Sequence, residues 1–151
     1  EFEQRLAEND AKVPAKVVMI QCVGPAEKNC SRICCTTALK NALKLKELNP
    51  TAEVTILYRD IRTYGFKERL YTQARREGIR FVHFEFDRKP KVRVSPPDSA
   101  QPGRLSVSIN EPMLQRDIEL VADLVVLRPR SRAARRGPGR RPPGTRGEAP
   151  S

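Results

Sequence analysis

The chain has 151 residues, which suits one domain with a hydrophobic core of ordinary size. It contains neither the run of roughly 18 apolar residues that a transmembrane helix needs nor a signal-peptide pattern, so we expect a soluble, cytoplasmic protein. Because it begins Glu1-Phe2-Glu3 without an initiator methionine, we also expect it to be part of a longer protein.

The formal net charge of +11 is concentrated at the C-terminus. Eight arginines and one glutamate lie between Arg128 and Ser151, so this tail carries +7 and the rest of the chain carries +4 of the total of +11. A charge of +4 on a folded body requires no polyanionic partner, and we expect no nucleic-acid-binding function. The tail is rich in proline and glycine and has almost no apolar side chains. Residues 128–151 are therefore predicted to be disordered, and residues 1–127 to form the domain.

The first predicted strand spans residues 17–22, Val-Val-Met-Ile-Gln-Cys, and ends at a turn at Gly24-Pro25. A short, continuous apolar run of this kind is typical of a parallel strand that is buried on both faces. From about residue 31 to 48, apolar side chains gather on one side of a predicted helix and charged side chains on the other. Asn49-Pro50 should end this helix, because proline disfavours the helical conformation at the residue before it.

The next elements repeat this order of strand and helix. Residues 53–58 form a second apolar strand, and residues 79–84 form a third. Between them, a helix closed by Gly78 has an apolar face made of Phe66, Leu70 and Ala74. Short connections and right-handed crossovers place such strands in a parallel sheet covered by helices, so the pattern predicts half of a doubly wound, Rossmann-like fold.

The pattern changes after Asp87. Alternating segments between proline and glycine turns predict the antiparallel strands of a small meander, at residues 91–94, 104–109 and 117–120. Residues 122–127, Ala-Asp-Leu-Val-Val-Leu, are again a buried-strand run that would return the chain to the parallel sheet. The predicted fold class is therefore α/β, a Rossmann-like arrangement of three layers in which helices and a small antiparallel meander cover a parallel sheet.

All four cysteines lie within one short stretch, at Cys22, Cys30, Cys34 and Cys35. In a cytosolic chain, such crowding favours metal binding or redox chemistry over disulfides. Cys22 ends the first predicted strand, whereas Cys30 and Cys34 would share one face of the following helix, with Cys35 one step round from them. Open α/β sheets bind ligands at this crevice, and a helix N-terminus stabilises thiolates there.

The spacing alone leaves three interpretations open. An iron–sulfur cubane is wide enough to be held at separate corners, and its negative charge could be offset by Lys28, Arg32 and Lys40. A single zinc ion fits less well, because two adjacent residues would have to converge on it. Cys22, Cys34 and Cys35 could also be small core residues, as unpaired cysteines often are.

Three segments of the chain resemble a known family. Gln21-Cys22-Val23-Gly24, Cys30-Ser31-Arg32-Ile33-Cys34-Cys35 and Tyr58-Arg59-Asp60-Ile61-Arg62-Thr63-Tyr64-Gly65-Phe66 look like parts of the A subunit of heterodisulfide reductase and its bacterial relatives. The similarity runs from about Phe2 to Leu127. It implies a thioredoxin-reductase-like flavoprotein that binds FAD and several [4Fe-4S] clusters. It also implies that Cys22, Cys30, Cys34 and Cys35 ligate one of these clusters.

The same resemblance implies an oxidoreductase that relays electrons within a cytoplasmic complex, with hydrogenase or dehydrogenase partners as electron donors. This chain would then be a catalytically incomplete fragment, with FAD bound mostly outside it. The chain departs from the family at Pro25-Ala26 and Asn29, and again after Leu127, where we interpret the tail as the product of a frameshift or truncation. The alternative function is a small zinc-binding module whose basic tail holds nucleic acid.

Other polar residues are weaker site candidates. Gly24 does not belong to a Gly-x-Gly-x-x-Gly fingerprint, so the usual dinucleotide site at this turn is missing. In the segment from Tyr58 to Phe66, the side chains of Arg59, Asp60 and Arg62 could contact a flavin, a cluster or a partner protein, or an Asp60–arginine pair could simply fix a loop. His83 is expected to be an ordinary packed residue rather than a ligand.

The composition of the tail yields a direct test. Cutting the chain after Leu127 should leave its fold and any cluster intact, because the removed residues cannot bury enough apolar surface to offset their ordering entropy. The cut should remove most of the affinity for heparin or DNA, measured by retention on a heparin column. Loss of iron from the truncated chain would show that the domain does not end at Leu127.

Overall fold

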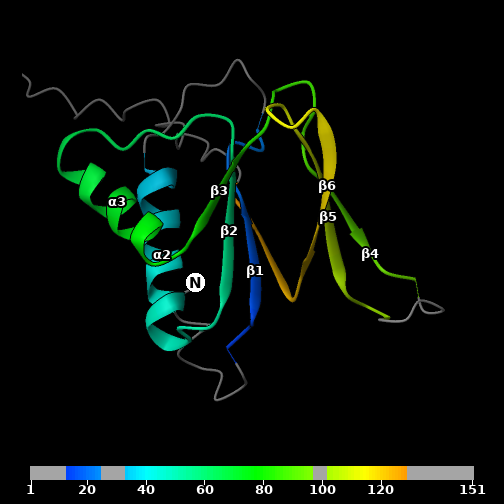
Figure 1. The fold of residues 1–151 in the computed structure, drawn as a ribbon, viewed down its shortest axis with the longest axis horizontal. Helices are drawn as coiled ribbons and strands as arrows, with labels where there is room; N and C mark the ends of the chain where they lie inside the picture. The colour runs from blue at the N-terminus through cyan, green and yellow to red at the C-terminus, as the bar shows by residue number, and fades with distance from the viewer. Residues whose placement is uncertain (1–12, 25–32, 97–101, 129–151) are drawn as a thin grey trace, which may run out of the picture.

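A computed structural model describes residues 13–24, 33–96 and 102–128 of the chain, and these residues form three layers. A parallel sheet lies in the middle, two helices cover one of its faces, and a smaller antiparallel sheet covers the other (Figure 1). This arrangement confirms the predicted α/β fold class.

The parallel sheet has four strands in the order β3-β2-β1-β7. Its strands are β1 (Lys16–Ile20), β2 (Glu53–Tyr58), β3 (Arg80–His83) and β7 (Leu124–Leu127). β1 pairs in parallel with β2 on one side, where Val18 faces Thr55, and with β7 on the other, where Val18 faces Val125. The predicted return of the chain to this sheet is therefore confirmed for residues 124–127, whereas Ala122 ends the antiparallel strand before it. β1 thus lies between two strands from distant parts of the chain.

The helical layer consists of α2 (Cys34–Leu48) and α3 (Glu68–Arg76), the latter preceded by a 3₁₀ turn, η1 (Gly65–Lys67). Side chains of α2 and α3 pack on one face of the sheet with β1 and β2, in a core cluster that includes Val17, Met19, Ala38, Leu39, Ala42, Leu45, Val54, Ile56 and Ala74. The residue after α2, Asn49, is extended (φ −141°, ψ 92°). Pro50 imposes this conformation on its neighbour, so the predicted end of the helix is confirmed.

The predicted apolar face of the second helix is only partly correct. Ala74 is fully buried and Leu70 packs against the core, but the side chain of Phe66 is 92% exposed. Phe66 lies in η1, and a 3₁₀ turn has three residues per turn instead of 3.6, so the helical spacing that placed Phe66 with Leu70 does not extend back to it. Gly78 closes the helix in the left-handed conformation (φ 76°) that the sequence predicts for it.

The antiparallel sheet consists of β4 (Lys91–Val94), β5 (Leu105–Glu111) and β6 (Arg116–Ala122), in that order. It confirms the predicted meander and packs on the second face of the parallel sheet through a cluster that includes Val18, Ile20, Cys22, Leu57, Phe84, Val107, Ile109 and Ala122. A single residue, Asp123, connects β6 to β7. Its carboxylate accepts a hydrogen bond from the Lys16 N–H (2.9 Å), and its own N–H donates to the Lys16 carbonyl (2.8 Å).

The structure does not test two of the predictions, because they concern residues that it does not describe. The predicted disordered tail lies almost wholly outside the described residues, which end at Arg128, and the boundary after Leu127 stays a prediction. The start of the first helix at about residue 31 also lies outside them, because the description resumes at Ile33.

Neither described helix, α2 or α3, has the length and apolar character needed to cross a bilayer.

Packing of α2 on the sheet is predicted to dominate the stability of this layer. Leu39 is completely buried, so Leu39→Ala should lower the free energy of unfolding by about 2–5 kcal/mol through lost apolar burial and a residual cavity. Leu48, in the same helix but 46% exposed, is the matched control, and Leu48→Ala should cost less than about 1 kcal/mol. Urea denaturation measures both values, and equal losses would contradict the observed orientation of α2.

Candidate functional site

Cys22 lies just beyond the carboxyl end of β1, in an unusual backbone conformation. The strand ends at Ile20, two residues earlier than predicted, although the Gln21 N–H still donates to the Leu57 carbonyl (2.8 Å). Cys22 itself has a φ of 59°, in the left-handed region that residues with a side chain rarely adopt. It is nevertheless buried, with an exposed fraction of 4%. The chain therefore leaves the sheet with the Cys22 thiol held in the protein interior.

Cys34 and Cys35 are the first two residues of α2, and both are buried. Among the described residues, no side chain caps the N-terminus of this helix, and its first turn contains no acidic residue. The N–H groups and the partial positive charge of a helix N-terminus favour negative charge on nearby sulfur atoms. The position of these cysteines thus suits thiolate chemistry better than a mid-helix position would.

The three described cysteines are linked through the segment that follows β2. The Asp60 carbonyl accepts a hydrogen bond from the Cys22 thiol (Sγ to O, 3.7 Å) and another from the Cys35 thiol (3.8 Å). Cys34 and the backbone of Arg62 also influence the Cys35 thiol, because both contribute to the shift of its pKa. Sulfur atoms from the end of β1 and the start of α2 are thereby gathered around one backbone segment.

These contacts also determine the protonation of Cys35. The hydrogen bond with Cys34, followed by burial, raises the pKa of the Cys35 thiol far above its ordinary value, and the neighbouring Cys34 and Cys22 add to the effect. The Arg62 N–H acts in the opposite direction, because it stabilises the thiolate. Without a bound cation, Cys35 is therefore a neutral thiol that donates its hydrogen bond.

Of the four predicted ligands, the structure brings together Cys22, Cys34 and Cys35, while Cys30 lies outside the described residues. Within residues 13–24, 33–96 and 102–128, no group of three or more histidine, cysteine, aspartate or glutamate side chains is arranged as it would be around a metal ion. No disulfide joins these three described cysteines. Of the three predicted charge-balancing residues, Lys40 is exposed on α2, and Lys28 and Arg32 lie outside the described residues.

The segment from Tyr58 to Phe66 contributes to the site mainly through its backbone. The Arg62 side chain pairs with the Asp60 carboxylate (Nε to Oδ2, 2.7 Å), which is the loop-fixing pair that the sequence allows. Arg59 lies over the Phe86 ring, 5.5 Å from its centre. The Asp60 carbonyl and the Arg62 N–H were not predicted, because every residue other than proline carries these groups and their direction leaves no trace in the sequence.

Tyr58, the first residue of this segment, contacts His83 on the neighbouring strand. Tyr58 makes edge-to-face contacts with Phe81 and His83, with ring centres 6.4 and 5.7 Å apart, and burial raises the pKa of its hydroxyl. The sequence predicts His83 as a packed residue of the sheet, but its side chain is exposed apart from this contact, because it is the last residue of the edge strand β3.

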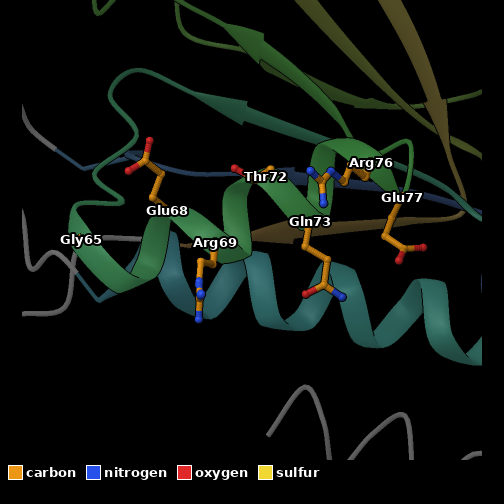
Figure 2. A pocket seen from close by; sticks show the side chains of 7 residues that line it. All are labelled: Gly65, Glu68, Arg69, Thr72, Gln73, Arg76 and Glu77. Carbon is orange, nitrogen blue, oxygen red and sulfur yellow. The ribbon is translucent and has the colours of Figure 1, made fainter.

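A separate hollow of about 700 Å³ lies along the outer side of α3. Figure 2 shows that the residues that line it all belong to this one helix and its two ends, namely Gly65, Glu68, Arg69, Thr72, Gln73, Arg76 and Glu77. None of the cysteines lines it. A hollow lined by only one helix would leave a bound molecule largely exposed to solvent. We therefore take the cysteines, and not this hollow, as the candidate site.

Comparison with known proteins identifies relatives of the chain. No family model matches it. The A subunit of the ferredoxin:CoB-CoM heterodisulfide reductase of Methanosarcina acetivorans is 38% identical over 120 residues, which are 76% of this chain and 14% of that protein. The iron-sulfur A subunit of the CoB-CoM heterodisulfide reductase of Methanocaldococcus jannaschii is 38% identical over 126 residues, 79% of this chain and 18% of that protein.

A third relative is the A subunit of the H(2)/formate:CoB-CoM heterodisulfide,ferredoxin reductase of Methanococcus maripaludis. It is 36% identical over 126 residues, again 79% of this chain and 18% of that protein. The chain thus spans less than a fifth of the length of these curated relatives. All three are the same component of their enzymes and match most of this chain, which confirms the resemblance seen in its cysteine and Tyr58 segments. The chain belongs, over this shared segment, to the family of heterodisulfide reductase A subunits.

Proposed function

We propose that the chain is the cluster-bearing portion of an electron-transfer oxidoreductase of the heterodisulfide reductase A type, and that Cys22, Cys30, Cys34 and Cys35 ligate one [4Fe-4S] cluster. The observation that carries the proposal is the convergence of Cys22 and Cys35 on the Asp60 carbonyl, with Cys34 next to Cys35 at the start of α2. Cys22 and Cys35 come from different elements, and their convergence on one backbone atom supports a shared role as ligands.

The chemistry of the donor set fits such a cluster. Cysteine thiolates are its ordinary ligands, and the sulfurs here are buried, which limits solvent access. Cys30 is joined to Cys34 by only three intervening residues, so the chain can bring it to the same end of α2. When bound, the cluster supplies one-electron transfer.

The groups around the cysteines would affect how their sulfur atoms bind the cluster. Because the pKa of Cys35 is raised, binding must displace its proton, and the Asp60 carbonyl then loses a donor. The Arg62 N–H and the N-terminus of α2 favour the resulting negative charge. Cys22 belongs to the apolar cluster between the two sheets, and such surroundings would influence the reduction potential.

The rest of the proposed protein would supply what this chain lacks. We propose that FAD and further iron–sulfur clusters are bound outside these residues. The partners would be the other components of a heterodisulfide-reductase-like complex in the cytoplasm. The names of the relatives mention ferredoxin, hydrogen and formate, which supports hydrogenase or dehydrogenase electron donors. The site itself would be a relay without a catalytic residue of its own.

Metal analysis tests the identity of the bound group. Protein purified or reconstituted without oxygen should contain about four irons and matching acid-labile sulfide per chain, with broad absorption near roughly 400 nm that bleaches on reduction. Stoichiometric zinc without sulfide would instead support the alternative, a zinc-binding module, and would overturn the cluster proposal.

Single substitutions test each ligand. Serine is nearly isosteric with cysteine but is a poor ligand for a soft cluster, so Cys22→Ser, Cys30→Ser, Cys34→Ser and Cys35→Ser should each lower the iron content or change the EPR signal. Thr36→Ser, beside the adjacent pair in α2, is the control and should retain a full cluster.

The results for Cys34 and Cys35, which are adjacent in the chain, show whether both residues are ligands. If Cys34→Ser or Cys35→Ser kept a full cluster with an unchanged spectrum, that residue would belong to the core. Since the chain has no fifth cysteine, the fourth ligand would then be an oxygen atom, His83 or a residue from another part of the protein.

A further inference from the structure

Two aromatic side chains are exposed at the turn that leads into α3. Tyr64 is 74% exposed and Phe66 is 92% exposed, which makes them the most exposed aromatic side chains in the described part of the chain. Gly65 lies between them in the left-handed conformation (φ 63°), which glycine adopts without strain. Single exposed apolar side chains are common, but aromatic side chains are enriched where proteins contact one another. The pair is therefore a candidate anchor for a partner.

The hollow along α3 begins at the same turn. Gly65 lies at one end of it, and the other residues that line it are polar or charged (Figure 2). An open hollow with one wall holds a small molecule poorly, but it can receive part of a protein surface. We call the exposed residues of the segment 64–77 the α3 surface; it combines an aromatic end with a polar hollow.

The charges of the α3 surface are mixed, with an excess of cations. The cations are Lys67, Arg69, Arg75 and Arg76, and the carboxylates are Glu68 and Glu77, which gives a net charge of +2. Within the described residues, no ion pair neutralises Lys67, Arg69 or Arg76. Unpaired cations around an apolar contact favour a partner of opposite charge, because they steer its approach and select against cationic surfaces.

The charge pattern also distinguishes between kinds of partner. A nucleic acid would bring phosphates against Glu68 and Glu77, whereas a protein can place a cation opposite each carboxylate. A second copy of the chain would bring another surface of net positive charge, on a molecule whose formal net charge is +11. An acidic protein therefore suits the α3 surface better than either of these.

We propose that the α3 surface docks a separate protein whose contact face is acidic around an apolar centre. Tyr64 and Phe66 are the anchors that fill this centre, and the cations of α3 contact its acidic rim. A few aromatic anchors commonly carry most of the binding free energy of an interface, and a contact of this limited extent is expected to be weak and transient.

The α3 surface borders the cysteine site along the chain. Tyr64 comes four residues after Asp60, whose carbonyl accepts hydrogen bonds from Cys22 and Cys35. A docked partner would thus contact the segment that also contacts the sulfurs. The proposed docking does not depend on a bound cluster, because none of the residues that form the α3 surface is a proposed ligand.

Peptide titration of the full chain as purified tests the chemistry of the partner. The probe is a synthetic peptide of glutamate and leucine, and NMR follows the backbone amides of residues 64–77. This peptide should shift these amides. Replacing its leucines by serine should weaken the effect at least about fivefold, and replacing its glutamates by lysine should abolish it. The basic tail attracts both acidic peptides alike, so only shifts within the α3 surface are counted.

A matched pair of variants tests the aromatic anchor. Phe66→Ser should weaken binding of the glutamate–leucine peptide about fivefold to thirtyfold, because it removes an anchor of the contact. Its thermal unfolding should match that of the wild type, because the side chain adds nothing to the core. Met113, between β5 and β6 on the other side of the parallel sheet, is 89% exposed, and Met113→Ser should bind like the wild type.

A second matched pair tests the charge. Arg69→Glu should weaken binding about twofold to fivefold, and the loss should shrink at high salt, since salt screens exposed charges. Arg116→Glu changes the net charge of the chain by the same amount, at an exposed position in β6. Its affinity for the peptide should stay close to that of the wild type at every salt concentration.

Three results would overturn the proposal. The first is equal binding by Phe66→Ser and Met113→Ser. The second is an oligothymidine that shifts the same amides more strongly than the acidic peptide and loses this effect in Phe66→Ser, which would make the partner a nucleic acid. The third is dimerisation in sedimentation experiments that Phe66→Ser abolishes, which would make the partner a second copy. Iron content measured on the same samples decides the proposed function separately, because peptide binding is read without reference to a cluster.

Discussion

Burial of β1 on both faces is the constraint on which the rest of the structure depends. Its alternating side chains divide between two cores, with Val17 and Met19 toward the helices and Val18 and Ile20 toward the antiparallel sheet. A strand that packs on two layers and pairs with two neighbours has little freedom to shift its register, because a slip of one residue would exchange the two sets of side chains. The position of Cys22, two residues beyond this strand, is fixed as a consequence.

The sequence predicts most of the fold, because the fold follows from apolar periodicity and turn chemistry. The second strand, the proline-terminated helix, the meander and the final parallel strand all agree with the structure. Phe66 shows the limit of this reasoning, since a short 3₁₀ turn interrupts the helical period and places an aromatic side chain in solvent. The grouping of the cysteines could be predicted from their positions at a strand end and a helix start. The roles of the Asp60 carbonyl and the Arg62 N–H could not, because backbone direction depends on the folded chain.

The site combines groups of different origin. Side-chain sulfurs come from the residues after β1 and the start of α2, and backbone groups come from the turn after β2. All three segments meet at the carboxyl edge of the parallel sheet, where doubly wound folds commonly bind their ligands. In dinucleotide-binding proteins a glycine-rich turn occupies this place and approaches a pyrophosphate. Here the same position carries cysteines, so one architecture presents different side-chain chemistry through the residues of a single crossover.

The backbone of Cys22 has a consequence for how this position can change over evolutionary time. At a φ of 59°, any side chain with a β-carbon is strained, and glycine would relieve the strain at once. A lineage selected for stability alone would therefore drift toward glycine, asparagine or aspartate at this position. A buried thiol stands here against the local preference of the backbone, so the backbone alone does not account for a cysteine at this position.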